Sequence, residues 1–433
     1  MTDELITDLA QLGMVRVISR TSVIHYKRSD KTAPQIGHEL GADALIEGTV
    51  QRVEDRVRIR IQLIDAAHDR HIWAQSYDRE LKNVLLLQTT AARDIVEEIQ
   101  GQVGKLRGGS QVAGARAVLP EAFDAYLRGH YFQNKRTDDA LRQSIEYFQQ
   151  AIAADPAFPQ AYAGLAESYS LLGSSVMPAE VARAKAKVAA SKAVELDPSL
   201  AEGHTQLGLV EFYYDWNWRE AQREFERAIE INPSYANAHR WYSYYLRAVG
   251  RFPEALNEAQ KAKQLDPLSL SISATVAGRY RDTHQYAQAL DESHRALELD
   301  PNFIPAHEAL AALYQEQGEF TLALSECRKA FELSHDNPSS LANLGYAYAV
   351  SGDRAAARKI VNQLIADPHY VAAWDVAVLF VGLGDADNAF RWLETSYRER
   401  ESQMPFLQVD HRLDPLHSDP RFQNLVHRLG LPL

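Results

Sequence analysis

The sequence predicts a mainly α-helical protein, in which a superhelix of about eight helix pairs follows a small α/β domain. Three observations lead to this prediction. An Asp-Pro or Asn-Pro dipeptide recurs between positions 155 and 368 with a period of about 34 residues. Small and aromatic residues recur in register between these dipeptides. Residues 1–103 lack the repeat, and residues 56–61 alternate with a period of two.

The dipeptides divide the chain into helix pairs. Proline cannot continue a helix interior, and the residue before it is driven out of the helical region. The seven dipeptides begin at Asp155, Asp197, Asn232, Asp266, Asp300, Asn337 and Asp367. Each is therefore expected to separate one helix pair from the next.

The residues between the dipeptides fit closely packed antiparallel helices. Small side chains let two helices approach, and aromatic side chains fill the space beside them. The recurring positions are Gly250, Phe252, Ala255 and Ala262 in one repeat, and Tyr280, Tyr286, Ala289 and Ala296 in the next.

The stretches GRFPEALNEAQKAKQLDP (250–267), QYAQALDESHRALELDP (285–301) and GEFTLALSECRKAFELS (318–334) resemble tetratricopeptide repeats. This resemblance implies a right-handed superhelix over residues 120–400, with an insertion at 173–183 and a degenerate last pair. Residues 401–433 are then a capping segment. A terminal helix is expected within residues 413–432, because the last repeat of a solenoid has no neighbour to cover it.

The first 103 residues predict a small α/β domain. The alternating segment 56–61 indicates a half-buried strand, paired with 43–53 through a turn at Glu54-Asp55, and 70–81 supplies a third strand. Residues 3–12, 34–40 and 83–103 have helical spacing, which gives the order α β α β β β α. Residues 104–119 have the composition of a linker.

The N-terminal segment LGMVRVISRTSVIHY and the strand region after it resemble the TolB amino-terminal-like domain. In bacterial signalling proteins this domain precedes tetratricopeptide arrays, as in CadC-type regulators and related kinases or cyclases. Family members have a first strand before the segment matched by MTDELITDLA, and the resemblance implies that Met1 is internal to a longer parent. An uncovered sheet edge would favour self-association.

The stretch EFYYDWNWREAQREF (211–225) contains six aromatic residues. Gly208 and Ala221, which mark the paired helices, lie thirteen positions apart where neighbouring repeats have twelve, so the YDWNW segment is expected to be a turn with one extra residue. Trp218 matches Phe252 of the next repeat, which predicts packing. Trp216 and Tyr213 have no counterpart, which leaves a ligand role open for them.

A partner-binding groove is expected along the first helices, because tetratricopeptide arrays usually bind extended peptides or partner helices there. Arginine and tyrosine are enriched in binding hot spots. The residues projected toward this groove are Tyr213, Arg240, Tyr244, Arg247, Arg281 and Asn343. For each residue singly, a solvated helix face is the simpler alternative.

Enzymatic and metal-binding signals are weak. The sequence has none of the glycine-rich phosphate loops, nucleophile elbows or HEXXH zinc motifs. The His68, Asp69 and His71 cluster has no further ligands at a suitable spacing. We therefore expect no catalytic residue, metal or cofactor. A net charge of −12 argues against direct nucleic acid binding, and no apolar run suits membrane insertion.

These features predict a non-enzymatic protein-binding scaffold, the sensory or regulatory region of a bacterial signalling protein. The alternative is a truncated transcription regulator, kinase or nucleotide cyclase whose output module lies upstream of Met1. Without a signal peptide, the chain as given is expected in the cytoplasm, or in the periplasm if its parent has a membrane anchor.

Overall fold

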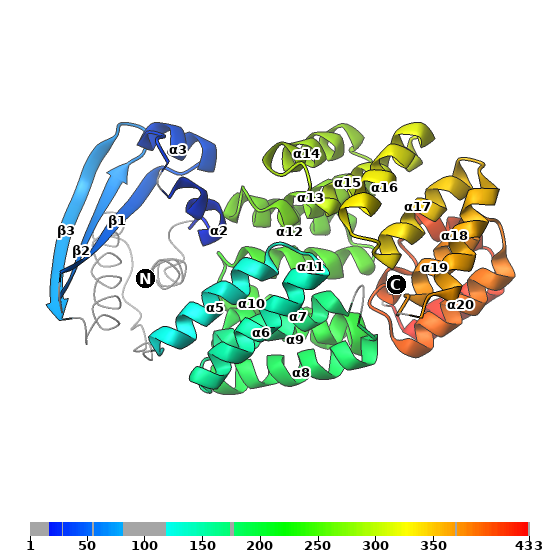
Figure 1. The fold of residues 1–433 in the computed structure, drawn as a ribbon, viewed down its shortest axis with the longest axis horizontal. Coiled ribbons are helices and arrows are strands. Elements are labelled where there is room, and N and C mark those ends of the chain that lie inside the picture. Colours follow the sequence, from blue (N-terminus) through cyan, green and yellow to red (C-terminus); the bar gives the residue numbers. More distant parts are fainter. Residues whose placement is uncertain are drawn as a thin grey trace. The chain divides into compact units, whose positions relative to one another are not determined.

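The computed structural model describes residues 17–27, 29–53, 56–80, 118–173, 177–368 and 370–431. It divides into two compact units, an N-terminal α/β unit and a helical unit. Figure 1 shows the three strands and the helices by their labels. None of the described helices is both long and apolar enough to cross a membrane.

The N-terminal unit contains a three-stranded antiparallel sheet in the order β1-β2-β3. The strands are β1 (Ala44–Val53), β2 (Arg56–Asp65) and β3 (Arg70–Glu80). This arrangement confirms the last three of the four strands in the predicted order, and β2 extends past the predicted segment to Asp65. Ile59, Ile61 and Leu63 are buried while Arg58 and Arg60 are exposed, as a strand with one buried face requires.

In the described residues before the sheet, the helical segments are α2 (Arg20–Val23), a 3-10 turn (Ile24–Tyr26) and α3 (Ala33–Leu40). Helix α3 confirms the segment predicted at 34–40, whereas α2 was not predicted. A Cβ on Gly37 of α3 would lie 2.6 Å from Ala66 Cβ, which shows how closely α3 approaches the end of β2. The helices predicted at 3–12 and 83–103 lie outside the described residues, as does 104–117 of the linker.

Eight consecutive helix pairs make up the helical unit within the described part of the chain. The pairs are α5 (Pro120–Gln133) with α6 (Asp138–Ala154), α7 (Pro159–Leu172) with α8 (Ala179–Leu196), α9 (Ala201–Val210) with α10 (Trp218–Ile231), α11 (Ala236–Ala248) with α12 (Phe252–Leu265), α13 (Leu270–Asp282) with α14 (Tyr286–Leu299), α15 (Ile304–Glu316) with α16 (Phe320–Leu333), α17 (Pro338–Val350) with α18 (Arg354–Ala366), and α19 (Ala373–Gly382) with α20 (Ala386–Glu399).

The Asp-Pro and Asn-Pro dipeptides form the turns between pairs. At five of them the side-chain oxygen of the Asp or Asn accepts a hydrogen bond from the backbone N–H two residues later. These bonds join Asp155 to Ala157, Asp197 to Ser199, Asn232 to Ser234, Asp300 to Asn302 and Asn337 to Ser339. This is the turn that short polar side chains favour, and it explains why Asp or Asn precedes the proline.

The joint within each pair also repeats. The residue two positions before the second helix has positive φ at Gly250, Gly318 and Gly352. Glycine is favoured there because it lacks a Cβ. The same position is Trp216 in the third pair and His284 in the fifth, at φ of 54° and 57°. The third joint therefore holds a bulky residue in a conformation that favours glycine.

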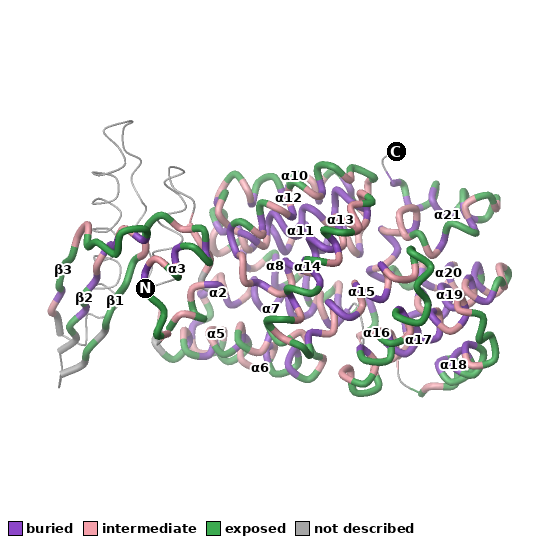
Figure 2. Tube along the Cα trace, turned by 90° about the horizontal axis from the view of Figure 1, so that it is seen from above, coloured by how far each residue is buried: buried purple, intermediate pink, exposed green. Residues whose placement is uncertain are grey.

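Small residues let the helices of a pair meet. A Cβ added at Gly129 of α5 would lie 2.7 Å from Phe148 Cε1 of α6, and one at Gly208 of α9 would lie 3.0 Å from Phe225 Cδ1 of α10. Both phenylalanines are fully buried. Figure 2 shows buried residues gathered along first helices such as α7, α11 and α13, with exposed residues along the outer turns.

The residues after α20 fold back onto the array. They form two 3-10 turns, Met404–Phe406 and His411–Leu416, and α21 (Pro420–Leu429). Helix α21 confirms the predicted closing helix. It contacts the last pair through ion pairs from Arg421 to Asp387 and from Arg428 to Glu394. Residues 401–416, which we name the inner segment, are central to the candidate site.

Candidate functional site

The aromatic stretch of the third pair is a π-helical turn followed by a tight joint. Residues Glu211–Asp215 form the π-turn, and α10 starts at Trp218, as α12 starts at Phe252. A π-turn accommodates one additional residue in a helix. This explains how the predicted extra residue fits while Trp216 and Trp218 keep the register of Gly250 and Phe252 in the next pair.

The two tryptophans of this stretch pack against the C-terminal part of the helical unit. Trp218 is buried, as predicted, and its indole Nε1 donates to the carbonyl of Leu429 at 3.1 Å. Trp216 lies between the Tyr397 ring, at 5.1 Å, and the Arg400 guanidinium, at 4.7 Å. Arg400 also donates to the carbonyl of Tyr214. These contacts give the aromatic residues a packing role.

The predicted groove residues lie in the π-turn after α9 and on the first helices α11, α13 and α17, and several of them bridge one first helix to the next. Arg240 donates to Thr275 at 3.2 Å, Arg247 to Asp282 at 2.9 Å, and Arg281 lies 3.3 Å from Glu316. Asn343 contacts Glu308 at 3.5 Å. Each contact joins equivalent positions of neighbouring repeats, so these side chains fasten successive repeats together.

The inner segment covers part of this first-helix surface. The Phe406 ring lies 6.2 Å from that of Tyr213 and 6.3 Å from that of Tyr244. Arg247 stacks over Phe406 at 5.1 Å and donates to the carbonyl of Val409 at 3.2 Å. Arg412 donates to Asn343 Oδ1 at 3.1 Å. Four of the six predicted groove residues therefore contact a segment of the same chain.

Charges at the inner segment are complementary to the array. Arg412 forms two close contacts with Asp410 Oδ2, the shorter at 2.7 Å. Burial opposes ionisation of Asp410, but the charges of Arg412 and Arg247 outweigh it and hold the pKa of Asp410 well below its usual range. Burial would lower the pKa of Arg247, but Asp282 and Asp410 raise it. Asp410 is therefore held as a carboxylate beside two guanidiniums.

Apolar burial also holds the inner segment in place. Met404, Leu407 and Leu413 are fully buried in a cluster that includes Trp241 and Trp374. At its start, Glu401 accepts hydrogen bonds from the backbone N–H groups of Ala373 and Trp374, at 2.7 and 2.9 Å. A carboxylate in this position satisfies free donors at the N-terminus of α19 and favours its dipole.

The predicted groove residues are more deeply buried than a solvent-facing groove would require. Arg240 and Arg247 are only 6% and 8% exposed, and Tyr213, Tyr244 and Asn343 are half-buried. Sequence reasoning missed Asp282, which faces Arg247, Arg279 and Arg281 together. It also missed the inner segment. The run MPFLQVD, apolar with a terminal acid, was the signal that could have pointed to a bound segment.

The remaining candidate residues form no further site. His68 lies on the surface 3.0 Å from Asp65, and the described residues contain no group of three or more His, Cys, Asp or Glu placed to hold a metal. Cys327 is buried, and burial raises the pKa of its thiol to about 12, so the thiol carries little of the reactive thiolate form.

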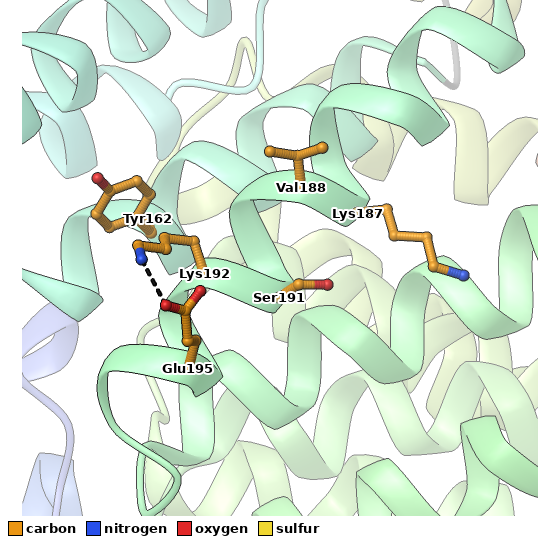
Figure 3. A pocket seen from close by; sticks show the side chains of 6 residues that line it. All are labelled: Tyr162, Lys187, Val188, Ser191, Lys192 and Glu195. Carbon is orange, nitrogen blue, oxygen red and sulfur yellow. Dashed lines mark hydrogen bonds and ion pairs between the residues drawn. The ribbon is translucent and has the colours of Figure 1, made fainter.

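A shallow surface hollow lies on the outer side of α8. Figure 3 shows its lining residues, with Lys192 paired to Glu195. Lys187 points away from them and pairs with Glu211 and Asp215. Val188 is 73% exposed. The hollow brings together no unpaired charges among these side chains, and we assign it no role.

Helix pairs that recur about every 34 residues, with small residues at the close contacts, make this unit a tetratricopeptide-repeat superhelix. A tetratricopeptide repeat family model matches residues 211–269, the segment that contains the aromatic turn. The crystal structure of the APC/C hetero-tetramer Cut9-Hcn1 aligns with a TM-score of 0.52 and 15% identity over 79% of this chain and 59% of that one. This likeness concerns the fold alone.

Curated relatives match parts of the chain. The putative adenylate cyclase 3 of Rhizobium meliloti (strain 1021) is 28% identical over 215 residues, which is 48% of this chain and 36% of that protein. The Hsp70-Hsp90 organizing protein 2 of Arabidopsis thaliana is 25% identical over 143 residues, 32% of this chain and 23% of that protein. The chain thus covers well under half of either relative's length.

Proposed function

We propose that this chain is a non-enzymatic, protein-binding scaffold that serves as the sensory or regulatory region of a bacterial signalling protein. The observation that carries the proposal is the inner segment lying on the first-helix surface. Aromatic contacts with Phe406, a guanidinium bond to the Val409 carbonyl and a guanidinium bond to Asn343 are interactions by which an array holds an extended peptide. The array surface therefore has the chemistry to bind a partner segment.

The proposed partner-binding residues are Tyr213, Arg240, Tyr244, Arg247, Arg281 and Asn343. Because the inner segment contacts four of them, a partner must either displace it or bind alongside it. The chemistry of the inner segment defines the partner that would compete best. This partner is an extended peptide with an aromatic residue followed, a few positions later, by an acidic residue.

The test uses a fluorescein-labelled synthetic peptide with the sequence of residues 401–416 and the full chain. In the Phe406→Ala/Arg412→Ala double variant the inner segment loses its ring and its bond to Asn343. We expect the peptide to bind this variant at least about tenfold more tightly than the wild type, from the loss of roughly 1.4 kcal/mol of internal competition. Fluorescence anisotropy measures both affinities.

Two controls make this result specific. The same peptide with its phenylalanine changed to alanine should bind the double variant more weakly. An additional Tyr244→Ala change should weaken binding of the unmodified peptide. Equal peptide affinity for the wild type and the double variant would contradict the proposed site. So would an affinity that neither the altered peptide nor the Tyr244→Ala change reduces.

The signalling role is supported by the relative named as an adenylate cyclase and by the resemblance of residues 1–103 to a TolB amino-terminal-like domain. In this proposal, residues 1–103, 104–119, 120–400 and 401–433 are a coupling domain, a linker, the array and its cap, and the output activity belongs to another module. An immunoblot of the source cells with an antibody against residues 120–400 tests it. A band well above the 48.7 kDa of this chain is the expected result.

A further inference from the structure

Three largely buried guanidiniums, which come from three different helix pairs, lie near Tyr244. Arg240 of α11 and Arg279 of α13 are 6% and 4% exposed. They approach the same aromatic ring, that of Tyr244, with Cζ at 5.9 and 5.1 Å from its centroid. Burial and, next, the charge of Arg240 lower the pKa of Arg136, which lies between α5 and α6, so the two guanidiniums are within electrostatic range of each other. We name these three residues the arginine cluster.

The acids near the arginine cluster do not balance it. Arg136 is paired with Glu167 at 3.3 Å, and Arg279 lies 3.0 Å from Asp282. Asp282, however, also faces Arg247 and Arg281. Arg240 has no carboxylate partner among the residues that the structure describes; its guanidinium stacks over the Trp241 ring at 4.2 Å.

Donor atoms of the arginine cluster are also unused. Nη1 of Arg240 and Nη1 of Arg136 are buried and have no hydrogen-bond acceptor within the described ranges. The buried hydroxyls of Ser170 and Ser243 likewise lack partners there. Buried guanidinium donors that lack an acceptor are unfavourable, because their desolvation is left uncompensated.

The pKa of the Tyr244 hydroxyl reflects the same excess of positive charge. Burial alone would raise the pKa of its hydroxyl. The charges of Arg240, Arg279 and Arg247, with a hydrogen bond to Thr275, outweigh burial and lower this pKa below its ordinary value. Burial also lowers the pKa of Arg279 to about 10, even beside Asp282.

We propose that the arginine cluster is a binding site for a phosphate-type oxyanion, held by Nη1 of Arg240 and Nη1 of Arg136. Guanidinium groups match the geometry of phosphate oxygens and form short, charge-assisted hydrogen bonds with them. The excess of positive charge is confined to this cluster, because the chain as a whole carries a net charge of −12. The phosphate is either free in solution or carried on a small molecule such as a nucleotide.

The test measures the melting temperature of the full chain while inorganic phosphate, or AMP in a second series, is titrated at constant ionic strength. Constant ionic strength keeps charge screening fixed. A ligand that binds the folded state raises the melting temperature as its concentration increases. If phosphate raises the melting temperature at the same concentrations as AMP, the ligand is a free oxyanion. If AMP acts at lower concentrations, the ligand is a phosphate carried on a nucleoside.

The variant Arg240→Met removes the charge and keeps a long, flexible side chain. We expect it to weaken the phosphate response at least about tenfold, because it removes a charge-assisted donor. We also expect a higher melting temperature than the wild type in phosphate-free buffer, since an unpaired buried charge is gone. The matched control Arg223→Met changes an arginine of α10 whose side chain is 70% exposed, and should keep the wild-type response.

Equilibrium dialysis of the wild type with radiolabelled phosphate gives a readout that does not depend on a variant folding. One bound phosphate per chain supports the proposal. No bound phosphate and no shift with AMP, or an equal response from Arg240→Met and the wild type, would overturn it. This test is independent of peptide binding, so either proposal can fail alone.

Discussion

The turns between repeats, which lie on the outside of the array, and the surface formed by its first helices, here called the inner surface, are held together in different ways. At the turns, Asp and Asn side chains bond to backbone groups two residues away. At the inner surface, side chains bridge the first helices of neighbouring repeats, and Arg247 reaches Val409, which lies far along the chain. Local turns thus define the repeat, while long-range bonds fix how the repeats assemble around the inner segment.

This difference predicts that changes at the inner surface destabilise the protein more than changes at the turns. The largest effect is expected for Asp282→Ala. Its carboxylate is 1% exposed and faces three guanidiniums. Removing one partner of a buried ion pair costs about 3–5 kcal/mol, because the opposite charges remain buried. Urea unfolding measures the loss.

The control for Asp282→Ala is Asp387→Ala, whose carboxylate is 90% exposed and pairs with Arg421. An exposed pair of this kind contributes no more than about 1 kcal/mol. If the two variants lost the same stability, the buried charges of the inner surface would not be structurally important.

A smaller loss is expected for Phe406→Ala, which removes the ring that joins the inner segment to Tyr213 and Tyr244. Because Phe406 is only half-buried, we expect a loss of about 2 kcal/mol, below the range for fully buried aromatic residues. The change should also speed amide hydrogen exchange in residues 404–412. Leu322→Ala on α16, at a 47% exposed site, is a control that should leave this exchange unchanged.

At the outer turns, Asp300→Ala removes the hydrogen bond from the backbone N–H of Asn302, which is 2.9 Å long. A loss of about 1 kcal/mol is expected, the usual net contribution of one hydrogen bond. Asp291→Ala, on the exposed face of α14 beside Arg295, should change stability by less. A loss from Asp300→Ala as large as that from Asp282→Ala would remove the contrast between the turns and the inner surface.

His204 of α9, which bonds to α10 and to the turn before α9, gives the stability of the third helix pair a pH dependence. Its Nδ1 lies 2.6 Å from Glu224 Oε2 and its Nε2 lies 3.0 Å from the Pro198 carbonyl, so only the protonated ring can donate both bonds. The hydrogen bond to Glu224 raises the pKa of His204. This contribution is present below the unfolded pKa of about 6.5 and is lost as pH rises through the folded value.

His204→Gln should therefore destabilise the protein by about 1 kcal/mol at pH 6, and by less at pH 8. Urea unfolding of both proteins across this range gives the difference. A difference that grew with pH would contradict the assigned role of the protonated ring.

The sequence predicted the parts of the fold that depend on local chemistry. Asp-Pro dipeptides located the turns, and the alternation at 56–61 located β2. Aligning the repeats with one another also placed Arg240, Arg247 and Asn343 on the first helices, where the structure has them. It could not separate a residue that binds a ligand from one that bonds to the next repeat, because both face the same side of a helix.

The inner segment could not be predicted from the repeat. Residues 401–416 lack the period, and their contacts with Tyr213 and Tyr244 join positions that are several repeats apart in the sequence. Arg279 and Asp282 were missed for the same reason. Their burial depends on helices from several pairs and on the inner segment, and no pattern along one helix reports that.

A photo-cross-link from position 406 tests most directly whether the inner segment lies on the first-helix surface. Phe406 is replaced by the photoreactive amino acid p-benzoylphenylalanine, the full chain is irradiated, and the cross-linked peptides are identified by mass spectrometry. Phe406 lies near the rings of Phe212, Tyr213 and Tyr244, at 5.8 to 6.3 Å. We expect intramolecular cross-links to residues 211–215 and 241–247. Cross-links only to other parts of the chain, or only between two chains, would contradict the account.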